Sequence, residues 1–211
     1  MLPMFITMSK KLTYIDLFCG AGGLSIGLAN AGFELIYAND FNKESIQTFK
    51  HNLKMTHPHL NSDNIIEGDI TELYKCLDTK RVYRKKMGYK TVTTDSEINM
   101  KKKAADLDEK HFDLVKKVKT VDLLCGGPPC QGFSMIGKSK KSTVEERSKG
   151  FINDSRNYLF KYFLKFAEAY KPKVILIENV KGIQSSSNFK DLIISNIKRQ
   201  GYKAESYVFS S

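Results

Sequence analysis

The stretch DLFCGAGGLSIGLANAGF, residues 16–33, decides the fold, because it has the pattern of a buried strand, a glycine-rich turn and a helix in direct succession. Gly20, Gly22 and Gly23 would let the backbone of the turn approach a ligand closely. The amino terminus of the helix that follows favours an anionic group on that ligand. Sites for several nucleotide-like cofactors share this arrangement, so the stretch alone predicts an α/β fold and leaves the ligand open.

Short apolar runs alternate with helical patterns along the rest of the chain. A parallel sheet covered on both faces produces this alternation, because its strands are buried on both sides. We therefore predict an α/β fold with a doubly wound, mostly parallel, Rossmann-like sheet. The predicted strands are residues 12–18, 34–39, 64–69, 121–126 and 173–179, and a sixth run, 205–210, alternates as an edge strand does.

Three helices are predicted from apolar residues that repeat at helical spacing. The first follows Asn42, a suitable N-cap residue, the second lies before Pro172, and the third ends at Gly201, which suits the position after a helix. Their apolar faces consist of Ile46, Phe49 and Leu53 in the first, Leu159, Phe160, Phe163, Leu164 and Ala167 in the second, and Leu192, Ile193 and Ile197 in the third.

Acidic residues end the second and third predicted strands. Asp40 lies twenty residues after Gly20, where an acid can accept hydrogen bonds from a ribose diol, and Asp69 could accept from an adenine amino group. Each could instead be a cap or turn residue at the surface. The carboxyl ends of parallel strands meet at one edge of a sheet. The glycine turn after the first strand and the acids after the next two therefore favour a cofactor site at that edge.

The stretch DLLCGGPPCQGFS, residues 122–134, places two prolines directly before a cysteine. Prolines fix their own backbone torsion and bias the preceding residue toward an extended conformation. Cys130 would therefore sit on a stiff elbow at the carboxyl end of a strand, where open α/β sheets bind their ligands. A cysteine that only fills the core needs no such elbow, so we interpret Cys130 as a nucleophile. Cys19 and Cys125 are interpreted as packing residues.

Length and composition indicate one domain over residues 1–211. The net charge of +11 and the pI near 9.4 favour a polyanionic partner such as nucleic acid. No apolar run approaches the roughly 18 residues of a membrane span, and the first residues lack the charge order of a signal peptide. The four cysteines form neither a disulfide framework nor a zinc pattern, and HPH at 57–59 lacks further ligands. We expect a reduced cytoplasmic protein with no metal and no membrane anchor.

Residues 79–119 interrupt the alternation of strands and helices. They carry thirteen lysines and arginines against six acidic residues, so much of the basic charge is concentrated there. We interpret the segment as an insertion that is either a solvated stretch of chain or an electrostatic arm for a phosphate backbone.

The motifs DLFCGAGGLSIG, GDI, GGPPCQGFS, DSRNYLF and ENV occur in that order. The series resembles the motifs of the cytosine carbon-5 DNA methyltransferases from about Tyr14 to Gly182, and PPCQGFS and ENV are its most specific parts. The resemblance implies an enzyme that transfers a methyl group from S-adenosylmethionine, leaving S-adenosylhomocysteine, to carbon 5 of a flipped cytosine in double-stranded DNA. It further implies a prokaryotic restriction-modification enzyme, associated with the nucleoid through DNA.

The resemblance also implies roles for individual residues. Cys130 and Glu178 would be catalytic, and Gln131 and Ser134 would contact the DNA or the flipped nucleotide. Phe41 could stack on the adenine, although it could also belong to the core. The cofactor pocket as a whole would be lined by Phe18, Gly20, Gly22, Gly23, Asp40, Phe41, Asp69, Ile70, Pro129 and Leu159.

The chemistry of cytosine explains why methylation at carbon 5 needs a nucleophile and an acid. Carbon 5 is a poor nucleophile, and addition of the Cys130 thiolate at carbon 6 would make it enamine-like. An acid at ring nitrogen 3 makes the ring electron-poor enough for that addition, and Glu178 fits this role, with Asn179 placed to orient it. A cytosine stacked in a duplex cannot reach this geometry, so the base must be flipped out.

The family pattern is incomplete in this chain. After ENVKG the family continues through a motif rich in glutamine and arginine, a variable target-recognition domain and a final helix, and none of these follows ENVKG here. We expect a catalytic and cofactor-binding domain whose sheet ends before its last strand hairpin. A truncated chain and one subunit of a split enzyme would both give this pattern, and the partner would be the missing region or a complementary subunit.

Other functions stay open from the residues alone. The same chemistry could act on transfer RNA, or the chain could be a noncatalytic DNA-binding subunit of a split methyltransferase. A nicotinamide oxidoreductase is a more distant alternative. Methylation assays on both nucleic acids, covalent capture by 5-fluorocytosine DNA and a cofactor titration would separate these functions.

Overall fold

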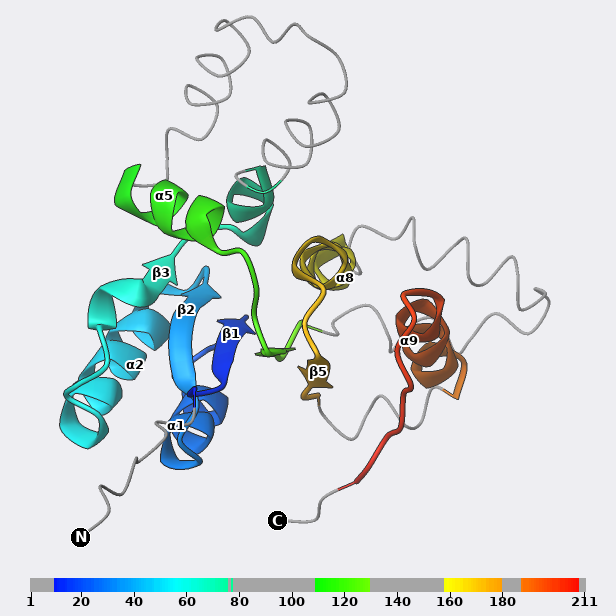
Figure 1. The fold of residues 1–211 in the computed structure, drawn as a ribbon, viewed down its shortest axis with the longest axis horizontal. Coiled ribbons are helices and arrows are strands. Elements are labelled where there is room, and N and C mark those ends of the chain that lie inside the picture. Colours follow the sequence, from blue (N-terminus) through cyan, green and yellow to red (C-terminus); the bar gives the residue numbers. More distant parts are fainter. Residues whose placement is uncertain (1–9, 76, 78–108, 130–157, 180–186, 209–211) are drawn as a thin grey trace, which may run out of the picture.

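A computed structural model of the chain describes residues 10–75, 77, 109–129, 158–179 and 187–208 (Figure 1). The sheet of this structure has five strands in the order β3-β2-β1-β4-β5, and every neighbouring pair is parallel. The strands are β1 (Thr13–Leu17), β2 (Glu34–Asp40), β3 (Ile65–Glu67), β4 (Leu123–Gly126) and β5 (Val174–Ile177). The predicted α/β class and parallel sheet are therefore confirmed.

Helices connect consecutive strands, as a parallel sheet requires. They are α1 (Gly23–Asn30), α2 (Lys43–Thr56), the 3-10 turn η1 (Ser62–Asn64), α5 (Glu109–Lys117), α8 (Tyr158–Tyr170) and α9 (Ser187–Arg199), and residues 70–75 are also helical. The predicted cap of α2 is present, because the Asn42 side chain accepts a hydrogen bond from the Ser45 amide. Gly201, after α9, has the positive φ of 92° that favours glycine at this position.

Two hydrophobic clusters cover opposite faces of the sheet. One joins β1, β2 and β4 to α5 and α8, and its largest fully buried side chains include Phe163 and Phe166. The other packs α1 and α2 against the sheet through Ile46, Phe49 and Leu53, the apolar face predicted for α2. Figure 1 shows α1 and α2 in blue and cyan on one side of the strands, with α5 and α8 in green and yellow on the other. The sheet is doubly wound.

A hydrogen-bonded acid joins three strands at the amino-terminal edge of the sheet. Asp122 Oδ2 accepts from the Thr13 amide at 2.9 Å and from the Thr13 hydroxyl at 3.1 Å. Its other oxygen forms an ion pair with Lys173 Nζ at 2.7 Å. Thr13 starts β1, and Asp122 and Lys173 directly precede β4 and β5, so these contacts join the three strands at their amino-terminal ends.

The predicted sixth strand is wrong for residues 205–208, which follow α9 without forming a strand. A strand is stabilised by a neighbour, and alternation of side chains alone supplies none. Within the described residues β5 is the edge of the sheet, and its Val174 and Leu176 side chains are 56% and 40% exposed. This apolar edge differs from the charged or covered edges that proteins usually present to water.

Candidate active site at the carboxyl edge of the sheet

The carboxyl ends of all five strands meet at one edge, because every strand runs in the same direction. The edge is formed by the turn after β1, the end of β2, the loop after β3, and the segments after β4 and β5. The sequence-predicted residues that it brings together are Phe18, Gly20, Gly22, Gly23, Asp40, Phe41, Asp69, Ile70, Pro129 and Glu178. Leu159 is half-buried in the first turn of α8, where it packs against the core.

The turn after β1 requires its glycines for two different reasons. Gly20 and Gly22 have positive φ values of 53° and 86°, a conformation that strains other residues. At Gly22 a Cβ would also lie 2.0 Å from Phe49 of α2, so the turn packs directly on that ring. Phe18 adopts φ 60° although it is not glycine, which is a strained conformation of the kind found at binding sites. The turn presents the amino terminus of α1 at the edge of the sheet.

Asp40 holds this turn against the end of β2. Its Oδ2 accepts a hydrogen bond from the Gly20 amide at 2.8 Å, and its Oδ1 accepts from the Asn42 amide at 2.8 Å. Each carboxylate oxygen has two lone pairs, so both retain acceptor capacity for a ligand's hydroxyl groups. The spacing of twenty residues between Gly20 and Asp40 in the sequence is thus a direct contact in the structure.

Phe41 extends into solvent next to Asp40. Its side chain is 78% exposed, which excludes the core role that the sequence had left open. An exposed aromatic ring directly after a strand can stack on a flat ligand, so the stacking role is the one compatible with its position.

Asp69 caps the helix that follows β3. Its Oδ1 accepts from the Thr71 amide at 2.7 Å, and its carbonyl accepts from the amides of Glu72 and Leu73. The capping alternative therefore holds for one of its two carboxylate oxygens. Ile70 is 3% exposed and belongs to the core, so a ligand would meet its backbone rather than its side chain.

Sequence reasoning missed Asp16, a buried acid in β1 beneath the glycine turn. Its Oδ2 accepts from the Ser25 hydroxyl of α1 at 2.6 Å, and Oδ1 has no hydrogen-bond partner among the described residues. The pKa of the Asp16 carboxyl is raised to about 6, and burial is the largest cause. Hydrogen bonds from Ser25 and Cys125 offset part of this increase, and the charge of Asp40 adds to it. A charged residue inside an apolar strand run was the signal that could have found it.

Asp16 should make the stability of the domain depend on pH. Its pKa is higher in the folded state than its ordinary value of 3.8, so its contribution is complete below about pH 4 and is lost as the pH rises through about 6. We expect Asp16→Asn to lose that dependence, a difference of about 2–3 kcal/mol in the free energy of unfolding between pH 4 and 7. Urea titrations across this range measure it. Asp191→Asn, on the surface of α9, serves as control, and equal pH slopes in wild type and Asp16→Asn would contradict the assignment.

Two hydrogen bonds join the end of β4 and the segment after it to the residues that follow β5. The Glu178 amide donates to the Gly126 carbonyl at 3.0 Å, and Asn179 Nδ2 donates to the Pro128 carbonyl at 3.1 Å. The exposed Glu178 side chain lies beside Gly127, which directly precedes the two prolines. Cys130, Gln131 and Ser134, which follow these prolines, lie outside the described residues.

The other predicted features have ordinary structural roles where they are described. Cys19 and Cys125 are buried free thiols whose pKa values are raised by burial, which confirms them as packing residues. His57 is buried, and its Nδ1 lies 3.0 Å from the Thr56 hydroxyl. No group of three metal-ligating side chains occurs within residues 10–75, 77, 109–129, 158–179 and 187–208. No helix in the same ranges is long and apolar enough to cross a membrane.

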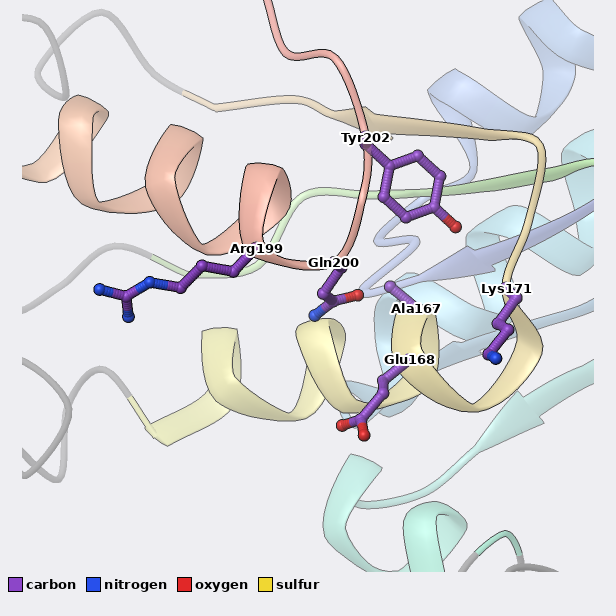
Figure 2. Close-up of a pocket in the computed structure, with 6 residues that line it drawn as sticks. All are labelled: Ala167, Glu168, Lys171, Arg199, Gln200 and Tyr202. Atoms are coloured by element: carbon purple, nitrogen blue, oxygen red, sulfur yellow. The ribbon is translucent and has the colours of Figure 1, made fainter.

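A separate pocket of about 390 Å³ lies at the opposite edge of the sheet, where α8 leads into β5. It is lined by Ala167, Glu168, Lys171, Arg199, Gln200 and Tyr202 (Figure 2). The Arg199 side chain extends away from the other five, and the Tyr202 hydroxyl donates to the Pro172 carbonyl at 2.7 Å. None of the sequence-predicted site residues lines this pocket, so it is distinct from the candidate site.

A parallel sheet with a glycine turn after its first strand and an acid at the end of the next is typical of α/β proteins that bind a nucleoside cofactor at the carboxyl edge. Comparison with protein families then identifies the particular family. The model of the C-5 cytosine-specific DNA methylases matches residues 12–81 and 77–211, and the chain belongs to this family. This family assignment confirms the resemblance that the motifs showed, and two relatives from Arabidopsis thaliana carry the name DNA (cytosine-5)-methyltransferase.

Several known proteins are similar to this chain. Type II methyltransferase M.AgeI of Thalassovita gelatinovora is 32% identical over 90% of this chain and 33% of its own length. Type II methyltransferase M1.HphI of Haemophilus parahaemolyticus is 28% identical over 100% of this chain and 44% of its own length. A crystal structure of a DNA modification methyltransferase encoded within an E. coli prophage has a TM-score of 0.49 at 24% identity, over 90% of this chain and 38% of that one. The chain thus spans between a third and a half of the relatives' length.

Proposed function

We propose that this chain is the catalytic and cofactor-binding part of an enzyme that methylates carbon 5 of a flipped cytosine in DNA, as part of a restriction-modification system. The observation that carries the proposal is the assembly at the carboxyl edge. The glycine turn, Asp40 and exposed Phe41 form one end of it, and Glu178 beside Gly127 forms the other. Membership of the C-5 cytosine-specific DNA methylase family supports methyl transfer to cytosine as the reaction of this site.

The residues present fit S-adenosylmethionine. The positive-φ glycines keep the turn close to the amino end of α1, Asp40 retains acceptor capacity for ribose hydroxyls, and the Phe41 ring is exposed beside it. Asp69 and the Ile70 backbone lie at the next strand end, in position to recognise an adenine edge. When bound, S-adenosylmethionine supplies an electrophilic methyl group.

The chain's own residues prepare the cytosine for transfer. The Cys130 thiolate adds to carbon 6, while the Glu178 carboxyl donates a hydrogen bond or a proton to ring nitrogen 3, and the electron pair moves toward carbon 5. After carbon 5 is methylated, a base removes its proton and elimination restores the thiolate of Cys130. Both residues act at a base that has left the duplex stack, and Gln131 and Ser134 are proposed to contact it or the neighbouring DNA.

We assign the reading of the DNA sequence to a region that lies outside the part of the relatives matched by this chain, either in cis or on a complementary subunit. The chain covers only 33% of one type II relative and 44% of another. Base-edge contacts specify sequence, whereas contacts to phosphates position the protein on DNA. The net charge of +11 suits contacts to phosphates. The exposed apolar residues of β5 offer a place where the region that makes base-edge contacts can attach.

The two strand-end acids provide a test of the proposed cofactor site. Asp40→Ala and Asp69→Ala should each weaken S-adenosylmethionine binding by about 1–3 kcal/mol, because each removes a charge-assisted hydrogen bond to the cofactor. Isothermal titration calorimetry measures the dissociation constants, with Asp63→Ala in η1 as a matched acid outside the edge. Unchanged affinity in both variants would show that the pocket has been misplaced.

Tritium transfer from labelled S-adenosylmethionine tests the reaction itself. The proposal predicts label in cytosine of DNA and not of transfer RNA, and stable covalent capture on DNA that contains 5-fluorocytosine. The fluorine blocks the final proton removal, so the enzyme stays attached to the base. The protein used is the chain joined to a target-recognition region, and in that form label on transfer RNA alone, or binding of DNA without capture or transfer, would contradict the proposed reaction.

A further inference from the structure

Gly127 lies between the ends of three strands at the candidate site. It follows β4, and a Cβ placed on it would lie 3.1 Å from Glu178 Oε2, 3.8 Å from the Glu178 carbonyl oxygen and 4.0 Å from the Phe18 carbonyl oxygen. The last two distances are ordinary van der Waals contacts. The Glu178 carboxylate is therefore the group that a side chain at position 127 would displace.

Hydrogen bonds on both sides of Gly127 hold the backbone of Glu178 in place. The Glu178 amide donates to the Gly126 carbonyl before it, and Asn179 Nδ2 donates to the Pro128 carbonyl after it. Parallel pairing of Gly126 with Ile177 continues this attachment into the sheet. With its backbone fixed at these points, Glu178 can adjust to a new neighbour only through its side chain.

The preceding glycine has a different requirement. A Cβ at Gly126 would lie 1.9 Å from the Leu17 carbonyl oxygen, which is backbone of the central strand β1 and cannot move aside. Gly126 is thus needed for the fold itself. Gly127 is not needed for the fold by this criterion, because among the residues that the structure describes its only tight neighbour is the end of an exposed, flexible side chain.

We propose that Gly127 is a positioning residue for the catalytic acid, an inference that rests on the proposed function. The absence of a side chain lets the Glu178 carboxylate rest against the backbone that leads into the two prolines and Cys130. A Cβ at position 127 moves the carboxylate away from this backbone. Because general-acid catalysis depends on the placement of the proton donor to within fractions of an ångström, the displacement lowers the rate without removing the acid.

Gly127→Ala tests the inference in the form of the protein that transfers methyl groups, either this chain or the chain joined to its target-recognition region. The first measurement is single-turnover methyl transfer to DNA. The second is exchange of tritium from carbon 5 of labelled cytosine into water with no methyl donor present, which needs thiolate addition, the acid at nitrogen 3 and proton exchange at carbon 5, but no methyl transfer. S-adenosylmethionine affinity and the thermal unfolding midpoint are measured alongside. Gly27→Ala, whose Cβ would face open space on α1, is the matched control.

We expect Gly127→Ala to slow both transfer and exchange by at least about tenfold, with cofactor affinity and the unfolding midpoint as in the control. In the Glu178→Asp background, where the shorter acid leaves room for the added Cβ, the same substitution should cost less than half of that factor on a logarithmic scale. Rates within about twofold of wild type, an equal cost in both backgrounds, or loss of folding in Gly127→Ala would overturn the inference alone. A wild-type protein with neither reaction would contradict the proposed function, and the inference with it.

Discussion

Cys130→Ser is expected to lower methyl transfer to DNA by more than about a thousandfold, the scale of effect seen when a catalytic nucleophile is removed. A thiol with an ordinary pKa near 8.5 is partly thiolate at neutral pH, whereas a serine hydroxyl is not ionised there. The substitution preserves the size of the side chain, so folding and S-adenosylmethionine affinity should change little. Tritium transfer under single-turnover conditions and calorimetric titration of the cofactor measure the two quantities separately.

Two controls make this result specific to Cys130. Cys125→Ala changes a buried thiol that contacts only the interior, and transfer per folded molecule should be retained. Glu178→Gln keeps Cys130 and should still allow slow capture on 5-fluorocytosine DNA, which Cys130→Ser should abolish. Transfer by Cys130→Ser at even about a tenth of the wild-type rate would remove Cys130 from its assigned role, since serine cannot replace a thiolate in this addition.

The fold could be predicted where apolar pattern and local chemistry agree. The runs that became β1 and β2 are near-continuously apolar, and parallel pairing on both sides buries Tyr14, Ile15 and Leu17 completely. Asn42 was predictable as a cap because its side chain satisfies a backbone amide only three residues further along the chain. The run at 205–210 failed because alternation indicates which face would be buried and does not supply the neighbouring strand.

The sequence could place candidate site residues at strand ends, but it could not predict the contacts between them. The sequence could place Gly20 and Asp40 at two strand ends, but the hydrogen bond that joins them depends on the adjacency of β1 and β2. Phe41 was ambiguous because burial depends on which helix covers the end of β2. Asp16 was missed because its partner Ser25 lies on the far side of the glycine turn, and the pair forms only when α1 folds back onto β1. Gly126 and Gly127 are the same residue type, so the sequence could not distinguish them. Only the structure shows that a Cβ would meet backbone at Gly126 and the Glu178 carboxylate at Gly127.

The second large effect concerns methyl transfer by the chain in the absence of a target-recognition region. The 211-residue chain should bind DNA with no sequence preference and should not methylate it alone. Its lysines and arginines can neutralise phosphates and release counterions, so the affinity should fall by several orders of magnitude between low and moderate salt, about a thousandfold or more. Filter binding on mixed-sequence DNA at several salt concentrations measures this term.

Addition of a target-recognition region, in cis or as a separate chain, should restore site-specific transfer through Cys130 and Glu178. Specific readout and stable base flipping both need contacts in the grooves, which phosphate binding does not provide. The added region should also cover Val174 and Leu176 on the open edge of β5, so protection of the β5 amides from hydrogen exchange should increase together with activity. The decisive comparison is tritium transfer to mixed-sequence DNA by the chain before and after complementation. Efficient, site-specific methylation by the chain alone would refute this prediction and would place the recognition element in the basic segment 79–119, where charge is already concentrated.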